Sequence, residues 1–212
     1  MYLSRLELDI CKRKTVQALA APNLFHGALG QAFPDDARHC LWRVDTLHGR
    51  RYLMILSKVR PDLTEVVLQF GNEESVWETK DYEPLLSRIK NGSSWHFRLV
   101  ANPTHSVGTK VQGERKRGKV FAHHTPEHQL KWLLDKADTN GFIIENEQCD
   151  VRDRHWYSFR KNSGSRHQVS IMGVTFEGIL TVNDELKFKD ALCKGIGRGK
   201  AYGMGLLTVV SI

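Results

Sequence analysis

Hydrophobic residues in the first hundred positions recur every second residue in some segments and every third or fourth in others. The first spacing predicts strands with one buried face, and the second predicts amphipathic helices. Leu6 and Leu8, for example, alternate with charged residues, whereas the apolar positions between 24 and 33 follow the helical spacing until Pro34. The predicted strands are 6–10, 41–47, 52–57 and 95–101, and the predicted helices are 24–33 and 83–90. This order reads β-α-β-β-α-β.

The second half repeats this order after a break at Pro103. Residues 103–120 are polar and basic and follow neither spacing, so we expect a basic connecting loop there. Thr125, Pro126 and Glu127 are an N-cap, a first-turn proline and a first-turn acid, which together predict a helix. The other predicted elements are strands at 142–145, 155–159, 168–172, 174–182 and 205–210 and a helix at 184–192.

Two units with the same element order predict an α+β protein of tandem ferredoxin-like (RRM-like, β-α-β-β-α-β) domains with antiparallel sheets. We expect an N-terminal domain at 1–102, the basic loop at 103–120 and a C-terminal domain at 121–212. A chain of 212 residues is long enough for two such cores. It has neither an apolar run that could span a membrane nor a signal-peptide pattern, so we expect a cytoplasmic protein without a membrane partner.

Charge is distributed unevenly along the chain, whose net charge is +7. Acidic residues gather between 62 and 83, while basic residues gather at 110–119, 152–166 and 187–200. A single basic cluster is often only a solvated surface, but three clusters in one half favour a polyanionic partner such as nucleic acid.

The glycine-rich segment 195–205 matches neither phosphate-loop template. GxGxxG would need glycine in place of Lys200, and a Walker A motif would need Ser or Thr in place of Ala201. Nucleotide hydrolysis therefore has no support. The alternate glycines instead predict a loop whose backbone, together with Arg198 and Lys200, can approach a phosphate closely.

Metal binding has little support. The four cysteines form no CxxC pair. The densest histidine cluster is His123, His124 and His128, but a helix that starts at Pro126 keeps His124 and His128 from sharing a helical face as HExxH requires. A metal-dependent nuclease or hydrolase at these three histidines stays open as a rival, while we expect no metal and no cofactor.

His26 lies in the first turn of the predicted helix that begins near Pro22. Free backbone N–H groups and the helix dipole favour a phosphate at this place. The ordinary pKa of histidine lets it take and return a proton near neutral pH, which attack by a ribose 2′-hydroxyl on the adjacent phosphate requires. A histidine at a helix edge is more often simply solvated, so its position alone leaves both interpretations open.

Five segments together resemble one family. They are MYLSRLELD, APNLFHGAL, FRLVANP, FEGILTVND and the closing GIGRGKAYGMGLLTV. In this order, and across nearly the whole chain, they are similar to CasE, the CRISPR RNA-processing endoribonucleases of type I-E Cascade systems, within the RAMP superfamily. The resemblance implies tandem ferredoxin-like domains, metal-independent cleavage of precursor RNA beside each repeat stem-loop, and retention of the product with the other Cascade subunits.

The resemblance also implies roles for single residues. His26 falls on the family's catalytic histidine, which acts on the 2′-hydroxyl and gives a 2′,3′-cyclic phosphate and a 5′-hydroxyl. Some members have tyrosine three residues earlier, where this chain has Asn23, so a tyrosine role is in doubt and Asn23 can instead cap the helix. Lys200 falls where relatives also carry lysine, and a cation there would neutralise charge on the phosphorane. Tyr202 lies nearby, and packing explains it at least as well.

RNA recognition is expected mainly in the second half. The resemblance implies that the basic hairpin turn 160–167 engages the RNA stem, and phosphate contacts should supply most of the affinity. The segment 110–119 is available to RNA or to a Cascade neighbour. The expected RNA-binding residues are Arg160, Lys161, Arg166, His167, Arg198, Lys200, Lys110, Arg115, Lys116 and Arg117. The rival from another class is a non-catalytic subunit that only holds the RNA stem-loop.

Overall fold

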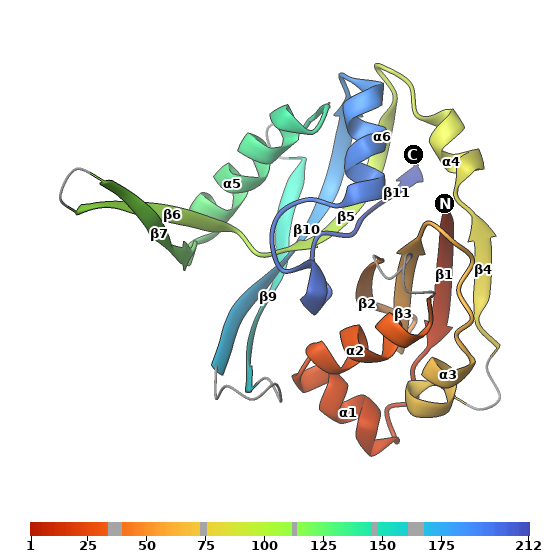
Figure 1. The fold of residues 1–212 in the computed structure, drawn as a ribbon. Coiled ribbons are helices and arrows are strands. Elements are labelled where there is room, and N and C mark those ends of the chain that lie inside the picture. The colour runs from red at the N-terminus through yellow and green to blue at the C-terminus, as the bar shows by residue number, and fades with distance from the viewer. Residues whose placement is uncertain (34–39, 73–75, 112–113, 146–147, 161–167) are drawn as a thin grey trace.

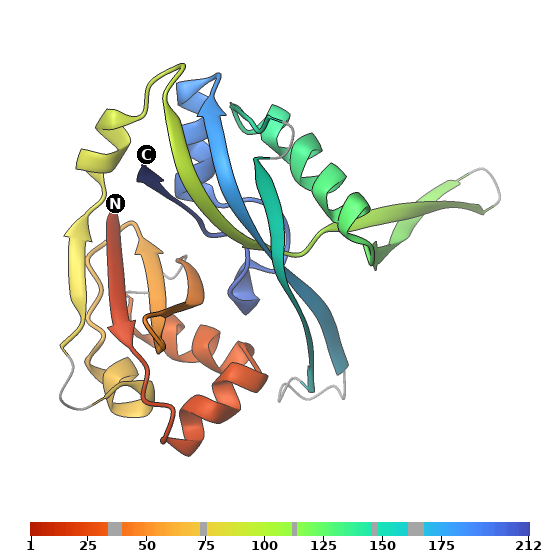
Figure 2. The same cartoon turned by 180° about the vertical axis from the view of Figure 1, so that it is seen from behind.

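The computed structural model describes residues 1–33, 40–72, 76–111, 114–145, 148–160 and 168–212. Their strands form two larger sheets and a separate hairpin (Figures 1 and 2). Among these residues, no helix is both long enough and apolar enough to span a membrane.

The first sheet has the strand order β2-β3-β1-β4, and all its neighbouring strands are antiparallel. Its strands are β1 (Tyr2–Glu7), β2 (Leu41–Leu47), β3 (Arg50–Ser57) and β4 (Glu78–Asp81). Its helices are α1 (Arg13–Ala20), α2 (Asn23–Gln31) and α3 (Thr64–Phe70). The fourth strand therefore lies beside the first, and the third lies between the first and the second, as in a ferredoxin-like unit.

Phe25 attaches α2 to this unit. Its ring is 1% exposed, and its centroid lies 5.6 Å from that of Trp42 on β2 and 4.9 Å from that of Phe70 on α3. Complete burial of a large apolar side chain contributes about 1.5–3 kcal/mol. Because α2 also carries His26, this packing fixes the backbone that presents the histidine.

The second sheet has the order β11-β5-β10-β8, with β9 also paired to β10, and its pairs are again antiparallel. Its strands are β5 (Ser94–Ala101), β8 (Phe142–Ile143), β9 (Cys149–Arg160), β10 (Gln168–Val182) and β11 (Leu207–Ser211). The associated helices are α5 (Pro126–Thr139), α6 (Glu185–Lys194) and the short 3-10 helix η2 (Lys200–Tyr202). The predicted α+β tandem of ferredoxin-like sheets is confirmed.

The sheets divide the chain at a different place from the predicted boundary. The strand at 95–101, expected to end a domain at 1–102, is β5, and it pairs with β10 and β11 of the second sheet. The fourth strand of the first sheet is instead β4, whose sequence ETKD has no hydrophobic alternation to reveal it. Helix α4 (Glu83–Arg88) connects the two sheets. The predicted N-terminal domain therefore included one strand too many.

The segment 103–120, predicted as a connecting loop, folds as a hairpin instead. Strand β6 (Thr104–Val111) pairs with β7 (Glu114–Ala122) in antiparallel register. The pair projects from the body of the protein between β5 and α5 (Figures 1 and 2). A projecting hairpin does not need the apolar face that a core-facing strand needs, so its sequence shows no alternation. We call residues 104–122 the hairpin arm.

Candidate active site

Helix α2 presents His26 to solvent. His26 is the fourth residue of α2, and its backbone N–H donates a hydrogen bond to the carbonyl of Pro22 at 3.3 Å. It therefore lies in the first helical turn, as predicted. Its neighbour Phe25 points into the core, while the His26 side chain is exposed. The helix thus combines an anchored face with an accessible imidazole.

The glycine-rich segment carries Lys200 back toward α2. The N–H of Ile196 donates to the carbonyl of Gly205 at 2.9 Å, and the N–H of Gly205 donates to the carbonyl of Val100, near the end of β5, at 2.7 Å. These bonds close the segment on itself and attach it to the second sheet. Gly203 has a φ of 77°, and a Cβ there would lie 2.7 Å from the ring of Trp42. Glycine therefore allows the loop to approach the first sheet closely.

One pocket of about 520 Å³ brings His26 and Lys200 together. It lies where α2 of the first unit packs against η2 of the second. Two further lysines line it, Lys58 after β3 and Lys194 at the end of α6. The other lining residues are Met1, Cys40, Leu41, Leu56, Cys193 and Ala201. None of the described lining residues is acidic, so the pocket suits an anion such as a phosphate.

The three lysines of the pocket differ in their ion pairs. Lys194 Nζ lies 2.7 Å from the Asp190 carboxylate one helical turn earlier, which offsets its charge. Within the described part of the chain, Lys58 and Lys200 have no ion-pair partner. The predicted Lys200 therefore supplies positive charge beside His26 that no described acidic residue offsets. Nothing in the sequence indicated Lys58, because a lone lysine after a strand carries no pattern.

The two cysteines of the pocket are protonated at neutral pH. Burial raises the pKa of the Cys40 thiol to about 12, and burial is also the main cause that raises the pKa of Cys193. The nucleophilic form of cysteine is the thiolate. The pocket therefore offers an imidazole and ammonium groups as its reactive side chains, and no cysteine nucleophile.

Asn23 and Tyr202 do not have the positions that a direct catalytic or capping role would need. Pro22 is the N-cap of α2, and no side chain caps this end, so the prediction that Asn23 caps the helix is wrong. The Tyr202 ring packs edge-on against Phe159, with centroids 5.4 Å apart. Tyr202 lines a different pocket from His26. The packing interpretation of Tyr202 is therefore favoured.

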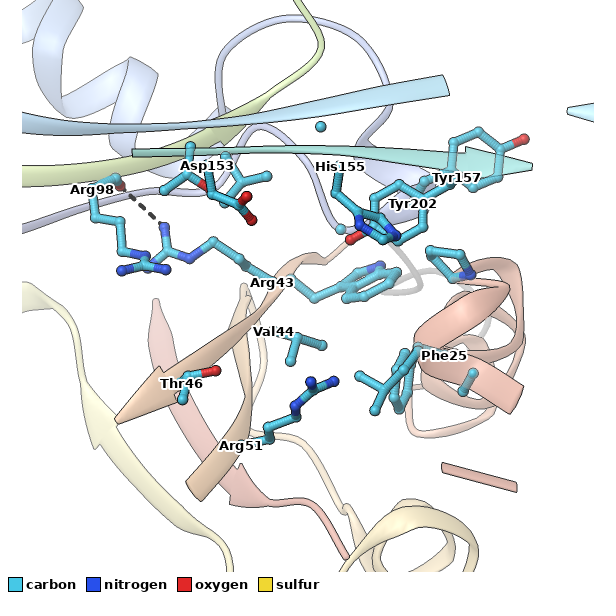
Figure 3. A pocket seen from close by; sticks show the side chains of 18 residues that line it. Phe25, Arg43, Val44, Thr46, Arg51, Arg98, Asp153, His155, Tyr157 and Tyr202 are labelled. Atoms are coloured by element: carbon cyan, nitrogen blue, oxygen red, sulfur yellow. Dashed lines mark hydrogen bonds between the residues drawn. The ribbon is translucent and has the colours of Figure 1, made fainter. Parts of the chain in front are cut away.

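That other pocket, of about 270 Å³, lies between the two units (Figure 3). Arg43 and Arg51 approach it from the first sheet, and Asp153 and His155 face them from β9. Arg43 donates a hydrogen bond to the carbonyl of Arg98, drawn as a dashed line in Figure 3. Acidic and basic groups are mixed here, which suits a polar junction between the units better than a phosphate site.

The predicted RNA-binding residues fall in three places. Arg160 ends β9 and is exposed, and Arg198 is exposed in the glycine-rich loop, where it forms an isolated bridge with Asn102. The residues Lys161, Arg166 and His167 lie outside the described part of the chain. The residues Lys110, Arg115, Lys116 and Arg117 belong to the strands of the hairpin arm, and their side chains lie outside the described structure.

The three histidines considered for a metal site pack against aromatic rings. His123 stacks with His128 at a centroid distance of 5.8 Å, whereas His124 lies 5.8 Å from the ring of Trp156. Among the described residues, no group of three or more His, Cys, Asp or Glu side chains has an arrangement that could hold a metal ion. The candidate catalytic pair at His26 and Lys200 is therefore separate from this cluster.

Comparison with known proteins gives matches along the full chain. A family model described as CRISPR associated protein matches residues 1–210. The chain is 29% identical over 220 residues to CRISPR-associated endoribonuclease Cse3 of Thermus thermophilus, covering 99% of both chains. It is 26% identical over 221 residues to CRISPR system Cascade subunit CasE of Escherichia coli (strain K12), covering 100% of both.

Solved structures agree with these matches. The fold is similar to that of Thermus thermophilus Cse3 bound to an RNA representing a pre-cleavage complex, with a TM-score of 0.80 and 26% identity over 99% of this chain and 98% of that chain. The resemblance to CasE found in the sequence is thereby confirmed. The chain belongs to the CRISPR associated protein family.

Proposed function

We propose that this chain is a metal-independent endoribonuclease that cleaves CRISPR precursor RNA at the repeat stem-loop and retains the product within Cascade. Two relatives that align along nearly its full length are named an endoribonuclease and a Cascade subunit. The observation that carries the proposal is the pocket in which His26 and Lys200 meet without a described acidic neighbour. Imidazole and ammonium are the two groups that transesterification of RNA needs in place of a metal ion.

In the proposed reaction, His26 removes the proton from a ribose 2′-hydroxyl, and the resulting oxygen attacks the adjacent phosphorus. The bond between phosphorus and the 5′ oxygen breaks, and that oxygen takes up a proton. The products are a 2′,3′-cyclic phosphate and a 5′-hydroxyl. Lys200 stabilises the additional negative charge that the phosphorane carries in the transition state. Lys58, in the same pocket, adds to the positive potential that holds the phosphate.

Affinity for the stem-loop in this proposal comes from basic side chains around the pocket. Exposed Arg198 lies in the same loop as Lys200, and exposed Arg160 lies at the end of the long strand β9. Contacts of such residues with phosphates are independent of sequence and weaken as salt rises. They would keep the cleaved RNA bound, which is what retention in Cascade requires.

The experiment that tests this function uses the purified chain, its own repeat RNA and excess EDTA. A second substrate carries one 2′-deoxy nucleotide just upstream of the cut. We expect cleavage of the first substrate with a 2′,3′-cyclic phosphate end and no cleavage of the second. Tight binding without cleavage of either substrate would make the chain the non-catalytic stem-loop-binding subunit. Activity that EDTA abolishes and a divalent ion restores would favour a metal-dependent nuclease.

A further inference from the structure

Four aromatic rings stack in one continuous row at the base of the hairpin arm. The ring centroid of Phe121 lies 5.9 Å from that of His105, which lies 4.7 Å from that of His123. The next step, from His123 to His128, is 5.8 Å. The planes of successive rings differ by 30°, 38° and 23°. We call these four residues the aromatic row.

Backbone geometry holds the aromatic row in place. His105 and Phe121 are directly opposite each other on β6 and β7. His128 lies in the first turn of α5, with its Nδ1 at 3.0 Å from the hydroxyl of the N-cap residue Thr125. The row therefore connects the hairpin arm to the start of a helix, and it is organised before any partner arrives.

The outer end of the row is open to solvent. Phe121 is 47% exposed, and the side chains of His105 and His128 are also exposed. A phenyl ring that is stacked on one side and half exposed contributes little to a hydrophobic core. It offers instead a flat apolar surface to a planar partner.

Positive charge lies beside this surface. Lys119 is two residues before Phe121, so both side chains lie on the same face of β7. Lys119 is exposed, and it has no ion pair with any residue that the structure describes.

One of the two inner rings of the row, His123, favours its neutral form. The pKa of His123 is lowered, first because burial disfavours the imidazolium and then because His105 and His128 lie beside it. A neutral ring stacks on its neighbours without bringing a buried charge into the row. The row therefore acts as an aromatic surface, while Lys119 supplies the cation.

Proteins bind single-stranded nucleic acid by combining exposed aromatic rings, on which bases stack, with basic side chains that contact the phosphates. We infer that the aromatic row binds an unpaired stretch of RNA that flanks the stem-loop, with a base stacked on Phe121 and a phosphate near Lys119. This inference rests on the proposed function. It differs from the RRM mode, because the stacking surface lies on the hairpin arm and not on the face of a ferredoxin-like sheet.

The test compares the affinity of the full chain for two non-cleavable repeat RNAs, each with a 2′-deoxy nucleotide at the cut. One is the stem-loop alone, and the other carries a short unpaired extension, placed at the 5′ or at the 3′ end. Stacking of one base on an aromatic side chain predicts that an extension at one end tightens binding about tenfold. Phe121→Ala should remove this gain and leave the affinity for the stem-loop alone unchanged.

Val120→Ala is the matched control. Val120 is 43% exposed and follows directly in β7 from Lys119, but its side chain lies on the opposite face from Phe121. It should keep the full gain from the extension. If neither extension tightens binding of the wild-type chain, or if Phe121→Ala weakens both RNAs equally, the inference is wrong.

Two further readouts separate this inference from the proposed function and from a protein contact. Cleavage of a stem-loop RNA that keeps the 2′-hydroxyl at the cut reports on the proposed function, and Phe121→Ala should leave this cleavage unchanged. A wild-type chain that cleaves this RNA but gains nothing from an extension contradicts only the aromatic-row inference. If the extension gives the wild-type chain no gain and Phe121→Ala reduces assembly with the other Cascade subunits, the row is a protein contact and the RNA inference is overturned.

Discussion

Arg43 and Asp45, two residues apart on β2, form a bidentate ion pair at the junction of the two ferredoxin-like units. Arg43 Nε lies 2.8 Å from one carboxylate oxygen of Asp45, and Nη2 lies 2.6 Å from the other. Arg43 also donates to the carbonyls of Arg98 at 3.1 Å and of Leu206 at 2.8 Å. Arg43 and Asp45 are 2% and 5% exposed. A charged pair from the first sheet thus satisfies a backbone carbonyl of β5 and the carbonyl of Leu206, the residue that follows the glycine-rich segment.

Loss of Arg43 should therefore destabilise the whole chain. Arg43→Ala leaves a buried carboxylate without its bidentate partner and removes a hydrogen bond from the carbonyls of Arg98 and Leu206. Breaking a buried ion pair from one side costs about 3–5 kcal/mol. Arg98 Nε remains 3.0 Å from Asp45 as an ion pair without hydrogen-bond geometry, so it replaces only part of the interaction. Urea unfolding followed by circular dichroism measures the change in the free energy of unfolding.

Arg5→Ala provides the comparison for Arg43→Ala. Arg5 pairs with Glu78 at 2.8 Å on the first sheet, but both side chains are largely exposed. Exposed ion pairs contribute about 0.2–1 kcal/mol. A similar loss of stability in both variants would contradict the role assigned to Arg43 at the junction between the units.

Gly203 supports a second prediction, about the loop that positions Lys200. Alanine at position 203 would place a Cβ 2.7 Å from the Trp42 ring at a φ of 77°. We expect Gly203→Ala to destabilise the chain by more than about 1 kcal/mol and to slow RNA cleavage, because the loop must move away from the first sheet. Gly30→Ala is the control, since its Cβ would meet no atom within 4 Å in a helix where alanine is preferred. Thermal unfolding measures the stability of both variants, and single-turnover cleavage measures their activity. Equal losses in Gly203→Ala and Gly30→Ala would contradict the strain assigned to position 203.

The sequence predicted which strands exist better than it predicted their partners. The alternation in β5 correctly indicated a half-buried strand, but it is equally compatible with either sheet. Pairing was then assigned from element order alone, because the true fourth strand, β4, is short and polar. A pattern of side-chain burial specifies a face, whereas the neighbour of a strand is set by contacts between segments far apart in the chain.

The candidate site was predictable only in parts. The position of His26 at the start of a helix and the failure of the glycine-rich segment to match nucleotide loops both followed from local sequence. That His26 and Lys200 meet in one pocket depends on the packing of α2 against η2, and only the family resemblance implied it. Arg43 lies in a strand where a charged residue predicts an exposed face, so nothing in the sequence pattern indicated its burial.

Lys200 and Lys194 line the same pocket, so comparing them tests whether Lys200 stabilises the negative charge of the transition state. Lys200→Ala removes a cation that no described acid offsets, and loss of a group that stabilises transition-state charge typically costs about 100-fold to 1,000-fold in rate. Lys194→Ala removes a cation already paired with Asp190 at 2.7 Å, so its effect should be much smaller. Single-turnover cleavage with saturating protein separates rate from affinity. Equal losses in the two variants would show that general positive charge matters, and not the position of Lys200.

His26 is the residue on which the proposed chemistry depends most directly. His26→Ala should slow cleavage at least about 100-fold, because general acid and base catalysis contributes about that much or more. Binding of the stem-loop should stay close to wild type, and the free energy of unfolding should change by less than about 0.5 kcal/mol, since the side chain is exposed. Gln31→Ala, an exposed change on the same helix, should leave the cleavage rate unaffected. Weakened RNA binding with residual cleavage in His26→Ala would remove the proton-transfer role and leave His26 as an RNA contact.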